Sequence, residues 1–212
     1  GVELRGVAGE HAGPDDPPAE RKRIRAIFSD AGIEIACVMG YNNFTCTDDA
    51  KRREQIATVK QYIALARDLG CPVLRVFGGR REGDDLQANI RRVADALREV
   101  APDARAAGIR LALETHDDWC VGANLAQVLD QVNSPAVGAC WDVANSFFVE
   151  PLTRTFTAIK SRIVHVHFKD ASRENDKTHS RLPGTGQVAM REALALLRDH
   201  GDRELQAELR RQ

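Results

Sequence analysis

Leu111-Ala-Leu-Glu114-Thr-His116 is a short apolar run that ends on a carboxylate. Two later stretches repeat this arrangement, Gly138-Ala-Cys-Trp141-Asp142 and Val164-His165-Val-His167-Phe-Lys169-Asp170. Short apolar runs of this kind are typical of strands that are buried on both faces. Polar residues therefore follow one strand after another at its carboxyl end, which is where a closed (β/α)8 barrel places its chemistry.

The rest of the chain alternates strand-like and helix-like segments. The candidate strands are Val2–Leu4, Glu34–Val38, Val73–Phe77, Arg110–Glu114, Ala136–Trp141, Ile163–Phe168 and Glu204–Leu209. The candidate helices cover residues 18–31, 48–69, 86–107, 125–132, 152–160 and 190–200. Pro18 suits a first helical turn and Gly70 a helix end, whereas Pro102 predicts a break or a kink. This βα repeat predicts a parallel sheet with right-handed crossovers.

Two architectures fit such a repeat, an open doubly wound sheet and a closed barrel. Gly78-Gly79 follows a candidate strand, but no GxGxxG or GxxxxGK pattern accompanies it, so the sequence gives little support to a nucleotide site. A closed barrel typically needs about 250 residues, and this chain has 212. We therefore expect a single (β/α)8 barrel domain over residues 1–212 that lacks the first strand–helix unit and the last helix.

Composition excludes several classes of protein. The chain is 43% hydrophobic and 29% charged, which is near the globular average and excludes wholesale disorder. A net charge of -1 offers no basic field for nucleic acid, and no apolar stretch is long enough to span a bilayer. The first residues read as a strand rather than as a signal peptide. The five cysteines show no CxxC spacing, so we expect reduced, mostly buried thiols in a cytoplasmic protein.

Four strand-end residues are the candidates for a metal site: Glu114, Asp142, His167 and Glu208. If their strands are neighbours, three carboxylates and one imidazole converge. Such an oxygen-rich set suits Mn²⁺, Mg²⁺ or Co²⁺ better than a thiolate zinc site, although Zn²⁺ also accepts these ligands. The alternative is that each acid caps the following helix or lies in a solvated loop.

Other polar residues near the strand ends have less specific predictions. His116 lies just past a strand and either contacts a ligand or lies on the surface. Lys169 either binds an anionic substrate oxygen or pairs with Asp170. Glu3 and Arg75 sit within strands, and because charges inside a barrel must be paired, we expect a structural role, with pairing to each other as one option.

The same pattern also gives predictions for one histidine and one long polar stretch. His165 is expected to be a satisfied interior histidine one layer below the site. The stretch 173–186 is long and basic at both ends, and we expect a loop that covers the substrate, with a flexible surface loop as the alternative.

In this order, the motifs resemble the xylose isomerase-like TIM barrels, the sugar phosphate isomerase/epimerase family. The stretches that carry the resemblance are Gly1-Val-Glu-Leu-Arg5, Leu74-Arg-Val-Phe77-Gly-Gly79, Leu111-Ala-Leu-Glu114-Thr-His116, Trp141-Asp142-Val-Ala-Asn145, His167-Phe-Lys-Asp170, Leu182-Pro-Gly184-Thr-Gly186 and Glu208. The resemblance implies that Glu114, Asp142, His167 and Glu208 bind the metal.

The resemblance also implies roles for individual residues. In family epimerases the two glutamates, here Glu114 and Glu208, move protons on opposite faces of the substrate, and a substrate-binding arginine falls on Arg173. Asn145 stands where the family often has histidine, and we place it with His116 and Lys169 among the substrate-binding candidates.

The resulting prediction is a metal-dependent sugar or sugar-phosphate isomerase or epimerase that works through a metal-stabilised enediolate. The alternatives are a dehydratase of an inosose-type keto-polyol on the same ligands, a phosphodiesterase, and a truncated barrel without turnover. The near-neutral charge argues against the phosphodiesterase. The expected partner is a small sugar or polyol, with no nucleic acid and no membrane, and association into a homo-oligomer is left open.

Overall fold

The computed structural model describes residues 1–83, 85–175 and 177–199, and its centre is a sheet of six parallel strands in chain order. The strands are β1 (Val2–Arg5), β2 (Ile35–Met39), β3 (Val73–Val76), β4 (Arg110–Glu114), β5 (Val137–Asp142) and β6 (Ile163–His167). Six of the seven predicted strands and their parallel pairing are thereby confirmed. The seventh, Glu204–Leu209, lies outside the described residues.

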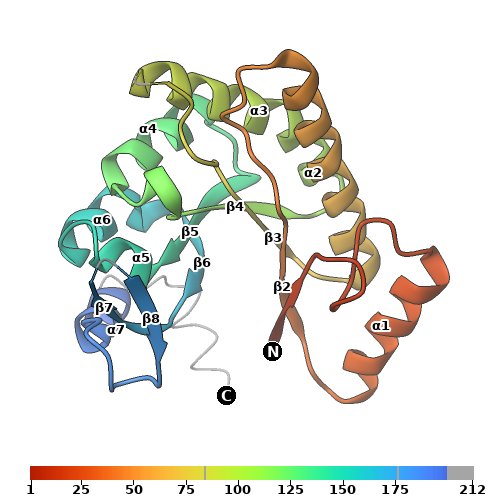
Figure 1. Cartoon of the computed structure of the whole chain (residues 1–212). Helices are drawn as coiled ribbons and strands as arrows, with labels where there is room; N and C mark the ends of the chain where they lie inside the picture. Colours follow the sequence, from red (N-terminus) through yellow and green to blue (C-terminus); the bar gives the residue numbers. More distant parts are fainter. Residues whose placement is uncertain (84, 176, 200–212) are drawn as a thin grey trace.

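Helices surround the outer side of this curved sheet (Figure 1). They are α1 (Pro18–Asp30), α2 (Asp49–Leu69), α3 (Leu86–Ala106), α4 (Gly122–Val132), α5 (Val143–Phe147), α6 (Leu152–Ile159) and α7 (Met190–Asp199), with short 3₁₀ turns at Asp117–Trp119 and Lys160–Arg162. The Asp48 side chain accepts a hydrogen bond from the Lys51 N–H at 2.8 Å and so caps α2. Gly70 ends the same helix with a φ of 73°, a conformation that glycine adopts without steric cost.

Of the two outcomes predicted for Pro102, the break is wrong, because α3 continues through it to Ala106. Proline removes one backbone hydrogen bond, and here that loss falls in the last turns of a long helix. The apolar face of α3, which includes the fully buried Val93 and Leu97, packs in the core and holds the helix in place on both sides of the proline.

Part of the stretch 173–186, for which the sequence predicted a loop, belongs to a hairpin. β7 (Asp170–Glu174) pairs antiparallel with β8 (Lys177–Arg181) to form a hairpin, and only the turn after it is irregular. Every described residue of β8 is exposed, so this strand has no apolar face from which alternation could be recognised. The carboxylate of Asp170 accepts hydrogen bonds from the backbone N–H groups of Gly184 (2.9 Å) and Gly186 (2.8 Å) and fixes the turn against the hairpin.

Strand residues alternate between the apolar core and the inside of the curve. Leu74 on β3 and Leu113 on β4 are fully buried in the core that the sheet shares with the helices, whereas their neighbours Arg75 and Glu114 face the inside. Glu3 on β1 lies 3.1 Å from His167 on β6, although these strands are opposite edges of the sheet. The sheet therefore curves as a barrel wall does. No helix in the described part of the chain is both long and apolar enough to cross a bilayer.

Candidate active site

The register of the sheet brings three of the predicted ligands together. Glu114 is paired with Cys140 across β4 and β5, and Asp142 is paired with His167 across β5 and β6. Glu114, Asp142 and His167 each offer one ligand atom, and these atoms lie within 4.8 Å of one another. We refer to these three residues as the strand-end cluster. The fourth predicted ligand and catalytic residue, Glu208, lies outside the described residues.

Within the strand-end cluster, the imidazole lies between the two carboxylates. His167 Nδ1 is 3.0 Å from Glu114 Oε1 and 3.6 Å from Asp142 Oδ2. Asp142 uses its other oxygen as a helix cap, since Oδ1 accepts a hydrogen bond from the Asn145 N–H at 2.8 Å. One oxygen of Asp142 thus takes the capping role that the sequence offered as an alternative, while the ligand role of the other oxygen, Oδ2, stays a prediction.

Arg75 anchors Glu114 from the strand beside it. Its Nε lies 3.1 Å from Glu114 Oε2, and the two side chains are only 3% and 4% exposed. Arg75 Nη1 also donates to the Gly40 carbonyl at 2.7 Å, and the guanidinium stacks 3.8 Å above the centre of the Phe77 ring. Sequence reasoning gave Arg75 a structural role only, and the option of pairing with Glu3 is wrong.

Glu3 instead contacts the strand-end cluster from the opposite edge of the sheet. Its Oε1 lies 3.1 Å from His167 Nε2 and 3.6 Å from His165 Nε2. Burial would raise the pKa of Glu3, but hydrogen bonds from His165 and His167 outweigh it and hold this pKa well below its usual range. His165 is three-quarters or more buried and partnered, as the sequence predicted.

The same contacts also shift the pKa values of His167 and Asp142. Burial would lower the pKa of His167, yet its hydrogen bonds with Asp142, Cys140 and Glu114, among others, raise it far above its ordinary value. Burial would raise the pKa of Asp142, but His167 and the Lys169 ammonium, 2.8 Å from Oδ2, lower it. Buried carboxylates at this spacing need positive charge beside them.

These residues fit a divalent cation. Glu114 Oε2 and Asp142 Oδ2 are buried and lack a hydrogen-bond partner in the described part of the chain, although Arg75 and Lys169 make ionic contacts with them. Two carboxylate oxygens and one imidazole nitrogen form a mixed set of hard and borderline ligands, which Mg²⁺, Mn²⁺, Co²⁺ and Zn²⁺ all accept.

The strand-end cluster opens into a cavity of about 520 Å³. Its lining also includes Glu3, Tyr41, Arg75, Phe77, His116, Phe168 and Lys169. His116 and Lys169 both line this cavity, and the His116 ring contacts the Phe77 ring at 4.5 Å. Lys169 pairs with Asp142 rather than with Asp170, and the substrate contacts of both residues stay predictions.

Two other predicted substrate contacts do not line this cavity. Asn145 directs its side-chain amide to the Thr115 carbonyl at 3.1 Å. Arg173, on the hairpin, stacks at 4.8 Å on the Phe148 ring and donates to the Phe148 carbonyl at 3.3 Å. In this conformation both side chains are held by structural contacts. Their roles toward substrate remain predictions.

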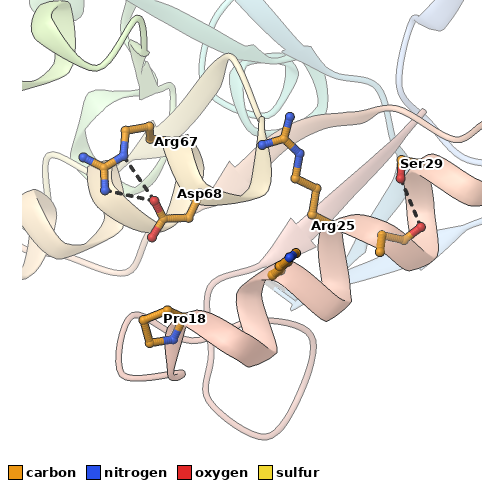
Figure 2. Close-up of a pocket in the computed structure, with 7 residues that line it drawn as sticks. Pro18, Arg25, Ser29, Arg67 and Asp68 are labelled. Carbon is orange, nitrogen blue, oxygen red and sulfur yellow. Dashed lines mark hydrogen bonds and ion pairs between the residues drawn. The ribbon is translucent and has the colours of Figure 1, made fainter.

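A second hollow, of about 770 Å³, lies on the outer surface between α1 and α2 (Figure 2). Arg25 and Arg67 border it, and its acidic residue, Asp68, is held by Arg67 at 2.9 Å and by Arg21 at 2.8 Å. Its lining contains no histidine or cysteine, and its carboxylate is already paired. Of these two hollows, the cavity at the strand ends is the one that brings carboxylates and an imidazole together.

Comparison with known proteins identifies relatives by sequence. Over 189 residues the chain is 29% identical to a 2-epi-5-epi-valiolone 7-phosphate 2-epimerase of an Actinoplanes species, covering 86% of this chain and 67% of that protein. Over 154 residues it is 29% identical to a 3-oxo-isoapionate decarboxylase of Pectobacterium atrosepticum, covering 72% of this chain and 50% of that protein. The chain thus spans between half and about two thirds of the length of these relatives.

Solved structures share the fold at lower sequence identity. A D-tagatose 3-epimerase-like protein superposes with a TM-score of 0.82 at 18% identity, over 94% of this chain and 77% of that one. A zinc-binding IOLI protein (TM-score 0.80, 17% identity, 94% of this chain and 75% of that one) and a Mycobacterium smegmatis protein in complex with magnesium (0.74, 17%, 94% and 73%) also match.

These likenesses confirm the (β/α)8 barrel fold predicted from the sequence, of which the described residues form six parallel strands. The model of the Xylose isomerase-like TIM barrel family matches residues 1–211, and the chain belongs to that family.

Proposed function

We propose that the chain carries the active site of a divalent-metal-dependent isomerase or epimerase of a sugar or sugar phosphate. The observation that carries the proposal is the convergence of Glu114, Asp142 and His167, from three successive strands, on one point at the floor of a polar cavity. The epimerase among the sequence relatives supports the reaction class.

Glu114, Asp142 and His167 would hold the cation, with Glu208 as the fourth ligand that the family resemblance implies. A divalent cation bound there would supply Lewis-acid polarisation of a substrate carbonyl. The two carboxylates favour Mn²⁺, Mg²⁺ or Co²⁺, and the imidazole leaves Zn²⁺ open. Neighbouring structures that hold magnesium or zinc support a divalent ion without selecting one.

Glu114 is the proposed base that removes a proton from the carbon beside the carbonyl. The contact between Arg75 Nε and Glu114 Oε2 fixes the carboxylate, so that Oε1 faces His167 and the cavity. General acid–base catalysis of this kind contributes typically about 10²–10⁴-fold to the rate. Return of a proton by the other predicted catalytic carboxylate, Glu208, to the opposite face would give an epimer, and return by Glu114 to the adjacent carbon would give an isomer.

Other cavity residues would position the substrate. The Lys169 side chain is half exposed, and its ammonium, 2.8 Å from Asp142, can donate to an anionic substrate oxygen. Tyr41 and Phe77 form an aromatic wall beside Arg75. The predicted contacts from Asn145 and Arg173 would require these side chains to leave their present partners.

Solvent deuterium exchange tests this function directly. The full chain is incubated in D₂O with Mn²⁺ and a panel of ketoses, ketose phosphates and keto-polyols, and deuterium at substrate carbons is followed by NMR. We expect exchange with the wild type and none with Glu114→Gln, because an amide cannot accept the proton. Glu150→Gln is the matched control, since Glu150 accepts from Gly122 N–H and Thr155 Oγ1, both at 2.7 Å, away from the cavity.

Wild-type exchange rates in Glu114→Gln would show that another residue removes the proton. Loss of water from a keto-polyol would instead favour the dehydratase reaction, in which the same proton removal is followed by expulsion of a hydroxyl group. One of the sequence relatives is a decarboxylase, which is a reason to look for products other than isomers and epimers.

A further inference from the structure

We infer that Glu3 is a positioning residue whose carboxylate accepts the Nε2–H of His167 and thereby holds the Nδ1 side of the imidazole toward Glu114 and Asp142, where a cation would bind. The inference rests on the proposed metal site, since it concerns how one of its ligands is oriented. No part of the family resemblance assigned this role to Glu3.

The imidazole of His167 lies within hydrogen-bond distance of a carboxylate on each of its two sides. Nε2 lies 3.1 Å from Glu3 Oε1, and Nδ1 lies 3.0 Å from Glu114 Oε1 on the other side of the ring. A carboxylate has only acceptors, so the nitrogen that faces Glu3 must carry a proton to make this bond. By the same rule Nδ1 carries a proton where it faces Glu114, and a cation bound at the strand-end cluster would take the place of that proton while Nε2–H stays on Glu3.

Geometry also explains why the partner comes from β1. Glu3 and His167 are 164 residues apart in sequence, but they face each other across the inside of the curved sheet. The Glu3 side chain is 24% exposed and the His167 side chain 15%, so water competes weakly for this hydrogen bond. Histidine ligands of metals are commonly oriented in this way by a carboxylate on their second nitrogen.

Glu3 could also belong to a metal site of its own, and this possibility must be distinguished from the positioning role. Glu3, Cys37 and His165 offer ligand atoms within 4.8 Å of one another, so these three residues could themselves hold a cation. The Glu3–His165 distance of 3.6 Å is longer than the 3.1 Å to His167, which favours the positioning role. The number of Mn²⁺ ions bound per chain distinguishes a second metal site from the positioning role.

The test compares Glu3→Gln, which retains an acceptor oxygen, with Glu3→Leu, which has none. The first measurement is the low-field Nε2–H resonance of His167 in ¹⁵N-histidine-labelled full chain, without metal and with Zn²⁺, identified by its absence in His167→Gln. The second is the Mn²⁺ dissociation constant and stoichiometry, from the electron paramagnetic resonance of free Mn²⁺. Glu150→Leu serves as the control for loss of a partly buried glutamate, and thermal unfolding verifies that each variant folds.

We expect the Nε2–H resonance in the wild type and in Glu3→Gln, and its loss in Glu3→Leu. We also expect Mn²⁺ binding about 10- to 100-fold weaker in Glu3→Leu, with Glu3→Gln closer to wild type. An unchanged resonance and unchanged affinity in folded Glu3→Leu would overturn the inference. So would two Mn²⁺ ions per wild-type chain, with one lost in both Glu3→Leu and Cys37→Ser, because Glu3 would then be a ligand.

Failure of the proposed function is distinguishable from failure of this inference. A wild-type chain that binds no Mn²⁺ would refute the metal site, and the NMR comparison would still decide whether Glu3 sets the proton on His167.

Discussion

Replacing Arg75 with methionine should destabilise the folded chain by about 3–5 kcal/mol, the usual cost of breaking a buried ion pair from one side. The 3.1 Å between Arg75 Nε and Glu114 Oε2 corresponds to about 5 kcal/mol of attraction at an effective dielectric constant of roughly 20. Methionine fills much of the same volume without charge. The Glu114 carboxylate, 4% exposed, would then lose the cation beside its Oε2, and the Gly40 carbonyl would lose its donor.

Thermal and urea unfolding, followed by circular dichroism at pH 7 in the presence of a chelator, measure this cost. A chain of this size loses about 2–4 °C per kcal/mol, so the melting temperature should fall by roughly 6–20 °C. Arg23→Met is the matched control: it breaks the exposed Arg23–Glu20 pair and should leave the melting temperature almost unchanged.

The double variant Arg75→Met/Glu114→Gln sharpens the test, because it removes both charges and leaves no buried ion without a partner. It should be more stable than Arg75→Met alone. The reasoning would be refuted by an Arg75→Met chain within about 1 kcal/mol of wild type, or by a double variant that loses the sum of the two single losses.

Two further predictions concern stability and reactivity outside the cavity. Asp170→Asn should lower the urea midpoint at pH 7, because hydrogen bonds from Gly186 and other backbone N–H groups hold the pKa of Asp170 below its usual value. This contribution is complete above the ordinary carboxyl pKa of about 4 and is lost as the pH falls through the lower folded pKa, so the gap between variant and wild type should close in acid; a gap independent of pH would contradict it. Burial raises the pKa of Cys71 and Cys140 to about 11 and that of Cys120 to about 12. At pH 8 these thiols should react with a disulfide reagent only after unfolding, and rapid labelling of any of them in the native chain would disprove this.

Hydrophobic periodicity and residues typical of helix ends were sufficient to predict the repeat of strands and helices from the sequence. The alternation of Leu111 and Leu113 with Glu114 marks β4, and Asp48 and Gly70 mark the ends of α2, because these signals act within a few residues. The strand-end rule then placed Glu114, Asp142 and His167 at one edge of a parallel sheet, and the structure brings them together.

The β7–β8 hairpin could not be predicted from such local patterns, for a physical reason. Its strands carry charged and hydroxyl side chains on exposed faces, so hydrogen bonding between two polar segments, rather than apolar burial, gives it shape. The same limit applies to Asn145 and Arg173, whose side chains are directed by the Thr115 and Phe148 carbonyls. Which neighbour a polar side chain chooses depends on contacts that no local pattern records.

The order of residues alone thus fixed the βα architecture, the family to which the chain belongs and three of the ligand candidates, because alternation and strand-end position are local properties. Only the folded sheet decided the partners: that Arg75 anchors Glu114 and that Glu3 reaches His167. The first pairing depends on the register of β3 against β4. The second depends on curvature that brings β1 opposite β6, and curvature is the summed twist of the whole sheet rather than a property of any one segment.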